Sequence, residues 1–120
     1  MSDWFVVNVA DATAFATKSA GAYVPFESKE APFQDFGINI HLLKPGQPNA
    51  KYHSEGVQED FLVLAGEAIA ILDDEERPLR AWDFVHCPAG VAHVFIGAGE
   101  GPCAILMVGA RREGRDDIDL

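Results

Sequence analysis

Two short stretches of the sequence hold four side chains that are able to bind a metal ion. His53 and Glu55 are separated by one residue, Glu59 follows the bend expected at Gly56, and His93 lies 40 residues beyond His53. Alternate side chains of a β-strand point to the same face, so we expect His53 and Glu55 to lie side by side. Two imidazoles and two carboxylates form a mixed donor set that suits Mn²⁺, Fe²⁺, Co²⁺, Ni²⁺ or Zn²⁺. These four residues therefore predict a divalent metal site.

Each member of this group has a more ordinary explanation when it is taken alone. A His-x-Glu pair on a strand is usually surface polarity, and a carboxylate beside a turn, such as Glu59, is usually solvated. A single histidine at position 93 is more often a hydrogen-bonded core or loop residue than a ligand. The metal site therefore requires a fold that brings these stretches together, and inward-facing side chains of a β-barrel do converge on its axis.

The elements that would position these residues are short strands. Apolar or alternating segments recur between Gly, Pro and Asp clusters, and helical periodicity is almost absent. This pattern is typical of an all-β sandwich or barrel. The predicted strands span residues 4–9, 36–43, 50–55, 59–65, 68–72, 77–80, 84–87, 91–96 and 103–108. No regular structure is predicted for residues 10–31.

A first motif around the predicted ligands resembles one of the cupin superfamily. In that family a Gly is followed after several residues by His-x-His, then by three or four residues, Glu, six residues and Gly. The present sequence has Gly46, then His53-Ser54-Glu55, then Glu59, then six residues to Gly66. The departure from the family pattern is Glu55, which replaces the second histidine.

A second motif resembles the same family. Its pattern is Gly, five residues, Pro-x-Gly-x-x-His, three residues, Asn. The sequence has Trp82 at the first position, Pro88-Ala89-Gly90-Val91-Ala92-His93 in the middle and Gly97 at the end, so both terminal positions depart from the pattern. The resemblance covers about residues 36–109 and is closest to the small single-domain cupins.

The resemblance implies a fold and a ligand set. The fold is a cupin-type β-barrel, also described as a double-stranded β-helix or jelly roll, over residues 36–110. Residues 1–35 would form an N-terminal, strand-containing arm, and residues 111–120 a charged, mobile tail. His53, Glu59 and His93 occupy family ligand positions. Glu55 occupies a ligand position with a changed residue type, and either binds the ion or accepts a hydrogen bond that orients His53.

The family resemblance leaves the function open between two main alternatives. One is a metal-dependent enzyme acting on a small molecule, with dioxygenases, decarboxylases and sugar isomerases all represented among cupins. The other is a non-catalytic module that binds or senses a small molecule and carries a structural metal. A cupin whose polar cluster is merely vestigial is a third alternative. No second constellation selects one chemistry, because fold does not decide function.

Composition limits the partners and the location. The chain has 120 residues, enough for one domain, and a formal net charge of −10, which disfavours nucleic-acid and membrane-surface binding. It has no apolar run near the ~20 residues that span a bilayer and no signal-peptide pattern, so a cytoplasmic location is expected. The two cysteines are expected to be buried and reduced. The strand predicted at 4–9 is too apolar to stay on an exposed edge and would add to its own sheet or to that of a partner, and a homodimer is predicted.

Four further side chains are considered. His86 alternates with Val85 and Cys87 and is expected to face outward if those two face the core. The role of His41 depends on which face of its strand is buried. Arg111 and Arg112 are expected to be solvated at the end of the last strand.

Overall fold

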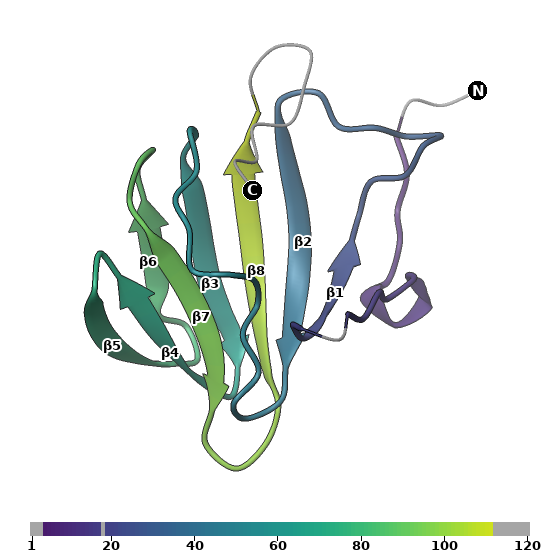
Figure 1. The fold of residues 1–120 in the computed structure, drawn as a ribbon. Helices are drawn as coiled ribbons and strands as arrows, with labels where there is room; N and C mark the ends of the chain where they lie inside the picture. The colour runs from purple at the N-terminus through teal and green to yellow at the C-terminus, as the bar shows by residue number, and fades with distance from the viewer. Residues whose placement is uncertain (1–3, 18, 112–120) are drawn as a thin grey trace.

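The computed structural model describes residues 4–17 and 19–111 and consists almost entirely of β-strands (Figure 1). A short 3₁₀ helix, η1 (Val9–Asp11), precedes them. The strands are β1 (Ala22–Pro25), β2 (Phe36–Leu43), β3 (Glu59–Ala65), β4 (Glu67–Leu72), β5 (Glu75–Arg80), β6 (Phe84–Cys87), β7 (His93–Ala98) and β8 (Cys103–Ala110). The prediction of an all-β fold is confirmed.

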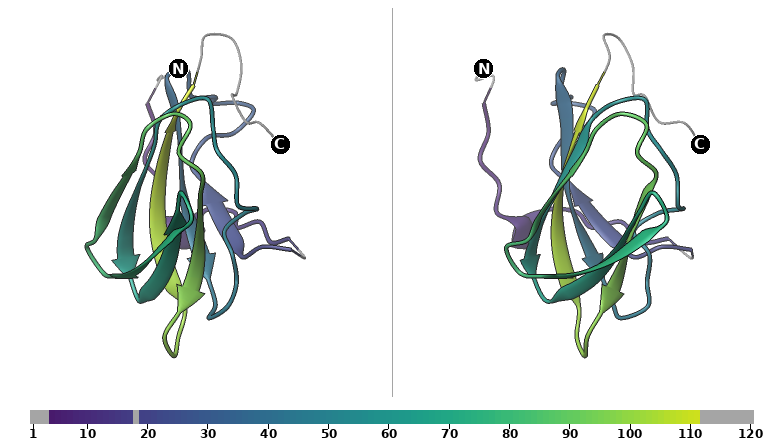
Figure 2. Two further views of the ribbon diagram at one scale, coloured as in Figure 1. Left: turned by 60° about the vertical axis from the view of Figure 1, so that its left-hand side comes forward. Right: turned by 90° about the vertical axis from the view of Figure 1, so that its left-hand side faces the viewer.

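The strands form two antiparallel sheets that face each other (Figure 2). The larger sheet has the order β1-β2-β8-β3-β6, and the smaller has the order β5-β4-β7. The described residues show no hydrogen-bonded ladder that closes these sheets into one barrel. The expected cupin-type fold is therefore present as a two-layer jelly roll.

Most predicted strands are confirmed within one or two residues. The seven strands from β2 to β8 correspond to the alternating segments recognised in the sequence between residues 36 and 108. The hairpin between β4 and β5 turns at Asp73 and Asp74, whose φ angles are 45° and 69°. Such left-handed conformations are tolerated by Asp and match the twist of a two-residue hairpin turn.

The predictions for the N-terminal region are wrong in two places. Residues 4–8 form no strand, and η1 follows them, with the Asn8 side chain accepting a hydrogen bond from the Ala10 N–H. Trp4 and Val6 are 73% and 88% exposed. The segment has the apolar composition of a strand, but no neighbouring backbone in the described structure pairs with it. Conversely, β1 lies in the segment for which no regular structure was expected, and it pairs with β2 at the edge of the large sheet.

The strand predicted for residues 50–55 is also absent. The connection from β2 to β3 instead runs along the free edge of β7 and touches it through two isolated bridges, Pro48 with Ile96 and His53 with His93. Between the two bridges the Phe95 N–H donates to the Asn49 side chain, and the Phe95 carbonyl accepts from the Asn49 N–H, so the backbone of residues 50–52 does not continue the ladder. The bridge at His53 nevertheless fixes this residue beside His93.

The inner face of the large sheet carries the core at one end. Alternation along β2 places Gly37, Asn39, His41 and Leu43 on one face, and Leu43 is fully buried in the core. Val63, Phe95 and Ile105 are likewise 0% exposed. The free cysteines Cys87 and Cys103 belong to this core as expected. None of the described residues forms a helix with the length and apolar character needed to cross a membrane.

Candidate metal centre

Backbone pairing places two histidines side by side. The N–H of His93 donates to the carbonyl of His53 at 2.8 Å, and the N–H of His53 donates back at 3.3 Å. The centroids of their imidazole rings are consequently 5.2 Å apart. His53 is on the connection from β2 to β3 and His93 is the first residue of β7, so residues 40 positions apart in sequence meet here.

Glu59 reaches the same point from the opposite sheet. It is the first residue of β3 and lies opposite Gly109 of β8. A Cβ at Gly109 would lie 3.3 Å from the Glu59 Oε2, so the glycine leaves space for the carboxylate. Glu59 Oε1 lies 2.6 Å from His93 Nε2.

The three residues form a group of donors suitable for a metal ion. One ligand atom from each of His53, Glu59 and His93 lies within 4.8 Å of the other two. The site is largely removed from solvent, since His93 is 2% exposed and the side chain of Glu59 is 12% exposed. The structure thus brings together three of the four residues predicted as ligands into one compact group.

The hydrogen bonds of the two imidazoles show that these donors fit a cation. Nδ1 of His93 lies 2.9 Å from the carbonyl oxygen of Val91, and Nδ1 of His53 contacts the carbonyl oxygen of Lys51. A neutral imidazole that donates from Nδ1 has only a lone pair at Nε2. In both histidines this Nε2 faces a carboxylate oxygen, so an added proton or a metal ion is needed between them.

Glu55 lies next to this group and has an unsatisfied oxygen. Its Oε1 is 2.7 Å from His53 Nε2, while Oε2 is buried and has no hydrogen-bond partner in the described structure. The residue as a whole is only 5% exposed. A buried carboxylate oxygen without a partner is costly and favours a nearby positive charge. Glu55 is outside the group of mutually close donors, so its role as a direct ligand stays a prediction.

The acidic surroundings favour a positive charge on His93. Burial lowers the pKa of His93, but the hydrogen bond to Glu59, the contact with the Val91 carbonyl and the charges of Glu59 and Glu55 together raise it. The same negative field that favours an imidazolium favours a divalent cation.

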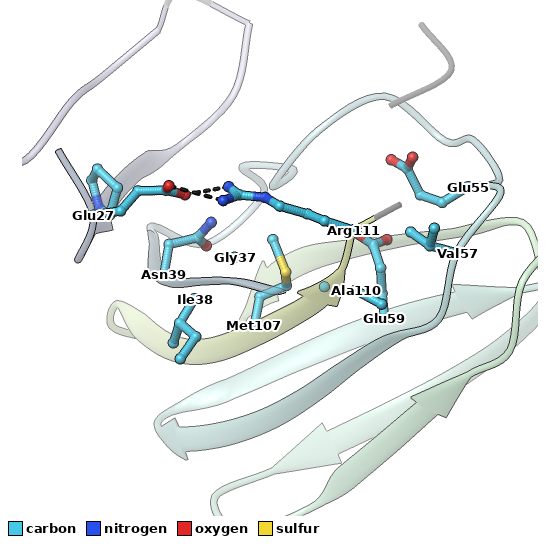
Figure 3. Close-up of a pocket in the computed structure, with 12 residues that line it drawn as sticks. Glu27, Gly37, Ile38, Asn39, Glu55, Val57, Glu59, Met107, Ala110 and Arg111 are labelled. Carbon is cyan, nitrogen blue, oxygen red and sulfur yellow. Dashed lines mark hydrogen bonds and ion pairs between the residues drawn. The ribbon is translucent and has the colours of Figure 1, made fainter. Parts of the chain in front are cut away.

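Two neighbouring cavities adjoin the candidate site. The first, of about 230 Å³, is lined by His41, Asn49, Ala50, His53, Glu55, Glu59, Phe61, His93 and Met107. The second, of about 120 Å³, shares Glu55, Glu59 and Met107 with the first and extends toward Glu27 and Arg111 (Figure 3). The metal group therefore lies on the wall of an internal space, where a small molecule can approach it.

Several lining residues were missed or left undecided in the sequence. His41 faces the cavity, and burial, partly opposed by the charge of Glu59, lowers its pKa to about 4. Asn39 and Met107 face each other across β2 and β8 and also line the cavities. The alternation of β2 carries the relevant signal, because Asn39 and His41 share a face with the core residue Leu43.

Of the remaining predictions for individual side chains, the one for His86 is confirmed and the one for Arg111 is wrong. His86 faces outward as expected, with a half-exposed side chain whose Nδ1 lies 2.6 Å from Asp60 Oδ1. The expectation for Arg111 is wrong, because its guanidinium forms a partly buried ion pair with Glu27 and donates to the Phe33 carbonyl at 2.8 Å. Arg112 and the remainder of the expected charged tail lie outside the described residues.

Comparison with known proteins agrees with this fold. The model of the family described as the cupin domain matches residues 39–109. No protein of curated function matches the sequence. Among solved structures, a predicted oxalate decarboxylase from Thermotoga maritima has a TM-score of 0.78 and 22% identity, covering 88% of this chain and 98% of its own.

Two further solved structures are similar in fold. A sugar phosphate isomerase from Silicibacter pomeroyi has a TM-score of 0.75 and 22% identity, covering 89% of this chain and 76% of its own. The polyketide cyclase RemF from Streptomyces resistomycificus has a TM-score of 0.78 and 16% identity, covering 98% of this chain and 87% of its own. At these identities the likeness concerns the fold alone.

Proposed function

The chain belongs to the cupin family, and from this premise we propose that it is a metal-dependent enzyme acting on a small molecule. His53, Glu59 and His93 hold a divalent ion, which is Mn²⁺, Fe²⁺, Ni²⁺, Co²⁺ or Zn²⁺ by the nature of the donors. Glu55 is the fourth ligand, and its unpartnered oxygen supports this role. The substrate enters the cavity that borders these four residues.

One observation carries the proposal. Both imidazoles are held at Nδ1 by backbone carbonyls and present Nε2 to carboxylates, inside a cavity rather than at the surface. A purely structural role would be met by a single histidine–carboxylate pair. Here two such pairs, His53 with Glu55 and His93 with Glu59, converge from separate elements, as the oriented ligands of metal sites do.

The chain's own residues would position the substrate and exclude water from the cavity. A divalent ion at this place supplies Lewis-acid character or an open coordination position for the substrate. Phe61 and Met107 provide apolar walls, and the lowered pKa of His41 keeps its imidazole neutral, so that one ring nitrogen can accept a hydrogen bond and the other can donate one. The similar solved proteins are named as a decarboxylase, an isomerase and a cyclase, so the type of reaction is not selected by likeness.

The experiment compares two histidine variants. His93→Ala removes a ligand, whereas His86→Ala removes a histidine that is paired with a carboxylate at the same 2.6 Å distance but outside the cavity. We expect the wild-type protein and His86→Ala to bind one divalent ion per chain and to turn over a member of a panel of acids, phenols and sugars. His93→Ala should lose both properties while its circular dichroism spectrum stays the same.

The other outcomes have definite meanings. Stoichiometric metal and small-molecule binding without turnover would replace the enzyme by a binding or sensing module. A purified protein that binds no metal in any of its variants would contradict the proposal altogether.

We also propose that the protein is a homodimer. Trp4, Val6 and Phe15 are exposed in the isolated chain, and among the described residues the outer edge of β1 is paired only by the isolated bridge of Tyr23 with Phe15. Apolar segments next to an open sheet edge are commonly covered by another chain. Light scattering should give twice the mass of one chain, and a monomeric mass would contradict this assembly.

A further inference from the structure

The second cavity is built on a strip of the sheet that has no side chains. Gly37 of β2 pairs with Gly109 of β8, and Gly109 in turn lies opposite Glu59 of β3. Neither glycine adds a side chain to the sheet, so Arg111 can lie over Gly37 and Glu59 beside Gly109, and a space of about 120 Å³ remains next to the metal group.

The next row of the sheet contributes an amide without a partner. Asn39 lies opposite Met107, and its Oδ1 is buried and accepts no hydrogen bond in the described structure. Figure 3 shows Asn39 and Glu55 on different sides of this cavity, with Met107 between them. Glu55 lines the same cavity. It is only 5% exposed, and its Oε2 also has no hydrogen-bond partner in the described structure.

Unsatisfied buried acceptors are rare, because each costs about 1–3 kcal/mol when no donor replaces the lost water. Because the Glu55 oxygen is assigned to the ion in the proposal above, the Asn39 oxygen is the acceptor that indicates a ligand with a hydrogen-bond donor in this cavity. The cavity is also lined by Glu27, Glu59 and Arg111, and the Arg111 guanidinium already binds Glu27 with two nitrogens and the Phe33 carbonyl. Gly37 permits this arrangement, since a Cβ there would lie 2.9 Å from Arg111 Nη2.

The charges of the cavity favour an uncharged ligand. Glu27 and Arg111 neutralise each other, and the divalent ion proposed above would balance the charges of Glu55 and Glu59. An anionic ligand would have to displace Glu27 from Arg111 and would approach two carboxylates. A neutral molecule with hydroxyl groups meets neither cost, and a hydroxyl hydrogen matches the free acceptor of Asn39.

We propose that the second cavity binds the hydroxyl-bearing, uncharged part of the substrate, and that Asn39 determines this specificity by accepting a hydrogen bond from a substrate hydroxyl. The inference rests on the proposed function, because the reacting part of the same molecule lies at the metal group. Asn39 is a binding residue in this account and does not contact the ion.

The experiment uses the zinc-loaded full chain and the polyol ribitol as the probe. Zinc binding is measured first by titration, and ribitol affinity then by NMR, in the wild type, in Asn39→Leu and in Gln34→Leu, which removes an exposed amide outside the cavity. Leucine is close in size to asparagine but has no polar atom. Loss of the hydrogen bond should weaken ribitol at least about tenfold in Asn39→Leu only.

A stability measurement separates binding from a structural role. Removal of a buried oxygen without a partner should leave the unfolding temperature of Asn39→Leu equal to or higher than that of the wild type. A structural asparagine would instead give a lower unfolding temperature. Zinc affinity should be the same in all variants, so failure of the metal site and failure of this inference appear in different measurements.

Three results would overturn the inference. One is the absence of ribitol binding to both the zinc-loaded and the metal-free protein. Another is equal ribitol affinity in the wild type and Asn39→Leu. The last is tighter binding of the matched anion ribonate that is lost in Arg111→Gln but not in Asn39→Leu, which would assign the cavity to an anionic ligand.

Discussion

The inner face of the large sheet differs sharply between its two ends. At one end Leu43, Val63 and Ile105 are fully buried and pack with Phe95 of the other sheet. At the other end the same strands carry Gly37, Asn39, Glu59, Met107 and Gly109 around two cavities. Strands β2, β3 and β8 cross both regions, so a single set of hydrogen-bonded ladders supports a dense core and an open polar site.

This difference indicates that stability depends mainly on the apolar end of the sheet and function on the polar end. The apolar end is closely packed, and loss of a side chain there leaves a cavity. The polar end holds unpaired acceptors and facing carboxylate and imidazole groups, which are costly until a cation and a ligand bind. Substitutions at the first end should therefore change stability, and those at the second should change binding.

The largest expected effect is at the apolar end. Phe95→Ala removes a ring that is 0% exposed and lies 4.1 Å from the Phe61 ring, centroid to centroid. The free energy of unfolding should fall by about 3–5 kcal/mol, as for other buried aromatic truncations. Urea denaturation measures this value, and a loss below about 1 kcal/mol would show that this end is not the main core.

A pH effect should come from the polar end. The pKa of His41 is lowered to about 4 in the folded protein, so between pH 6.5 and 4 the unfolded chain binds more protons. Stability due to this group is complete above pH 6.5 and is lost as the pH falls, by up to about 3 kcal/mol. His41→Gln should reduce the loss, and His86→Gln, which changes an outward-facing histidine, should not.

Metal binding should stabilise the protein through the polar end alone. Zinc at about 100 times its dissociation constant should raise the unfolding free energy of the wild type by about 2.7 kcal/mol. A chelator should reverse this gain. In His93→Ala the gain should disappear, and a gain equal to that of the wild type would place the ion elsewhere.

The smallest expected effects are those of two glycine substitutions, one at the apolar end and one at the polar end. A Cβ at Gly97 would lie 2.3 Å from the Lys44 carbonyl oxygen, which is backbone, so Gly97→Ala should cost about 1–3 kcal/mol of stability. A Cβ at Gly109 would meet Glu59 Oε2 at 3.3 Å and Met107 Sδ at 3.5 Å. Gly109→Ala should therefore cost less stability but weaken zinc binding. The reverse order of the two effects would contradict the assignment of the two ends.

The sequence was sufficient for the strands that alternate between buried and exposed positions. It was also sufficient to predict that His53, Glu59 and His93 lie close together, because their spacing follows two motifs. It failed for residues 4–9, where an apolar segment has no pairing strand in the described chain, and for residues 50–55, which pair with β7 only through the isolated bridge of His53 with His93. Apolar composition alone does not supply a partner for the backbone.

The cavity residues were less accessible to sequence reasoning. Asn39 and Met107 lie in no recognisable motif, and their importance follows from the register that pairs them across β2 and β8. The ion pair of Arg111 with Glu27 joins positions 84 residues apart, which no local pattern encodes. Such pairings depend on the tertiary arrangement of the strands.

The central claim is that one divalent ion binds between the two sheets at the polar end. A crystal of the protein grown with Mn²⁺ or Zn²⁺, with data collected at the absorption edge of that metal, tests this most directly. The account predicts one strong anomalous peak per chain, in contact with Nε2 of His53, Nε2 of His93 and a carboxylate oxygen of Glu59. Anomalous peaks only at surface carboxylates, with these three side chains still paired to one another, would contradict it.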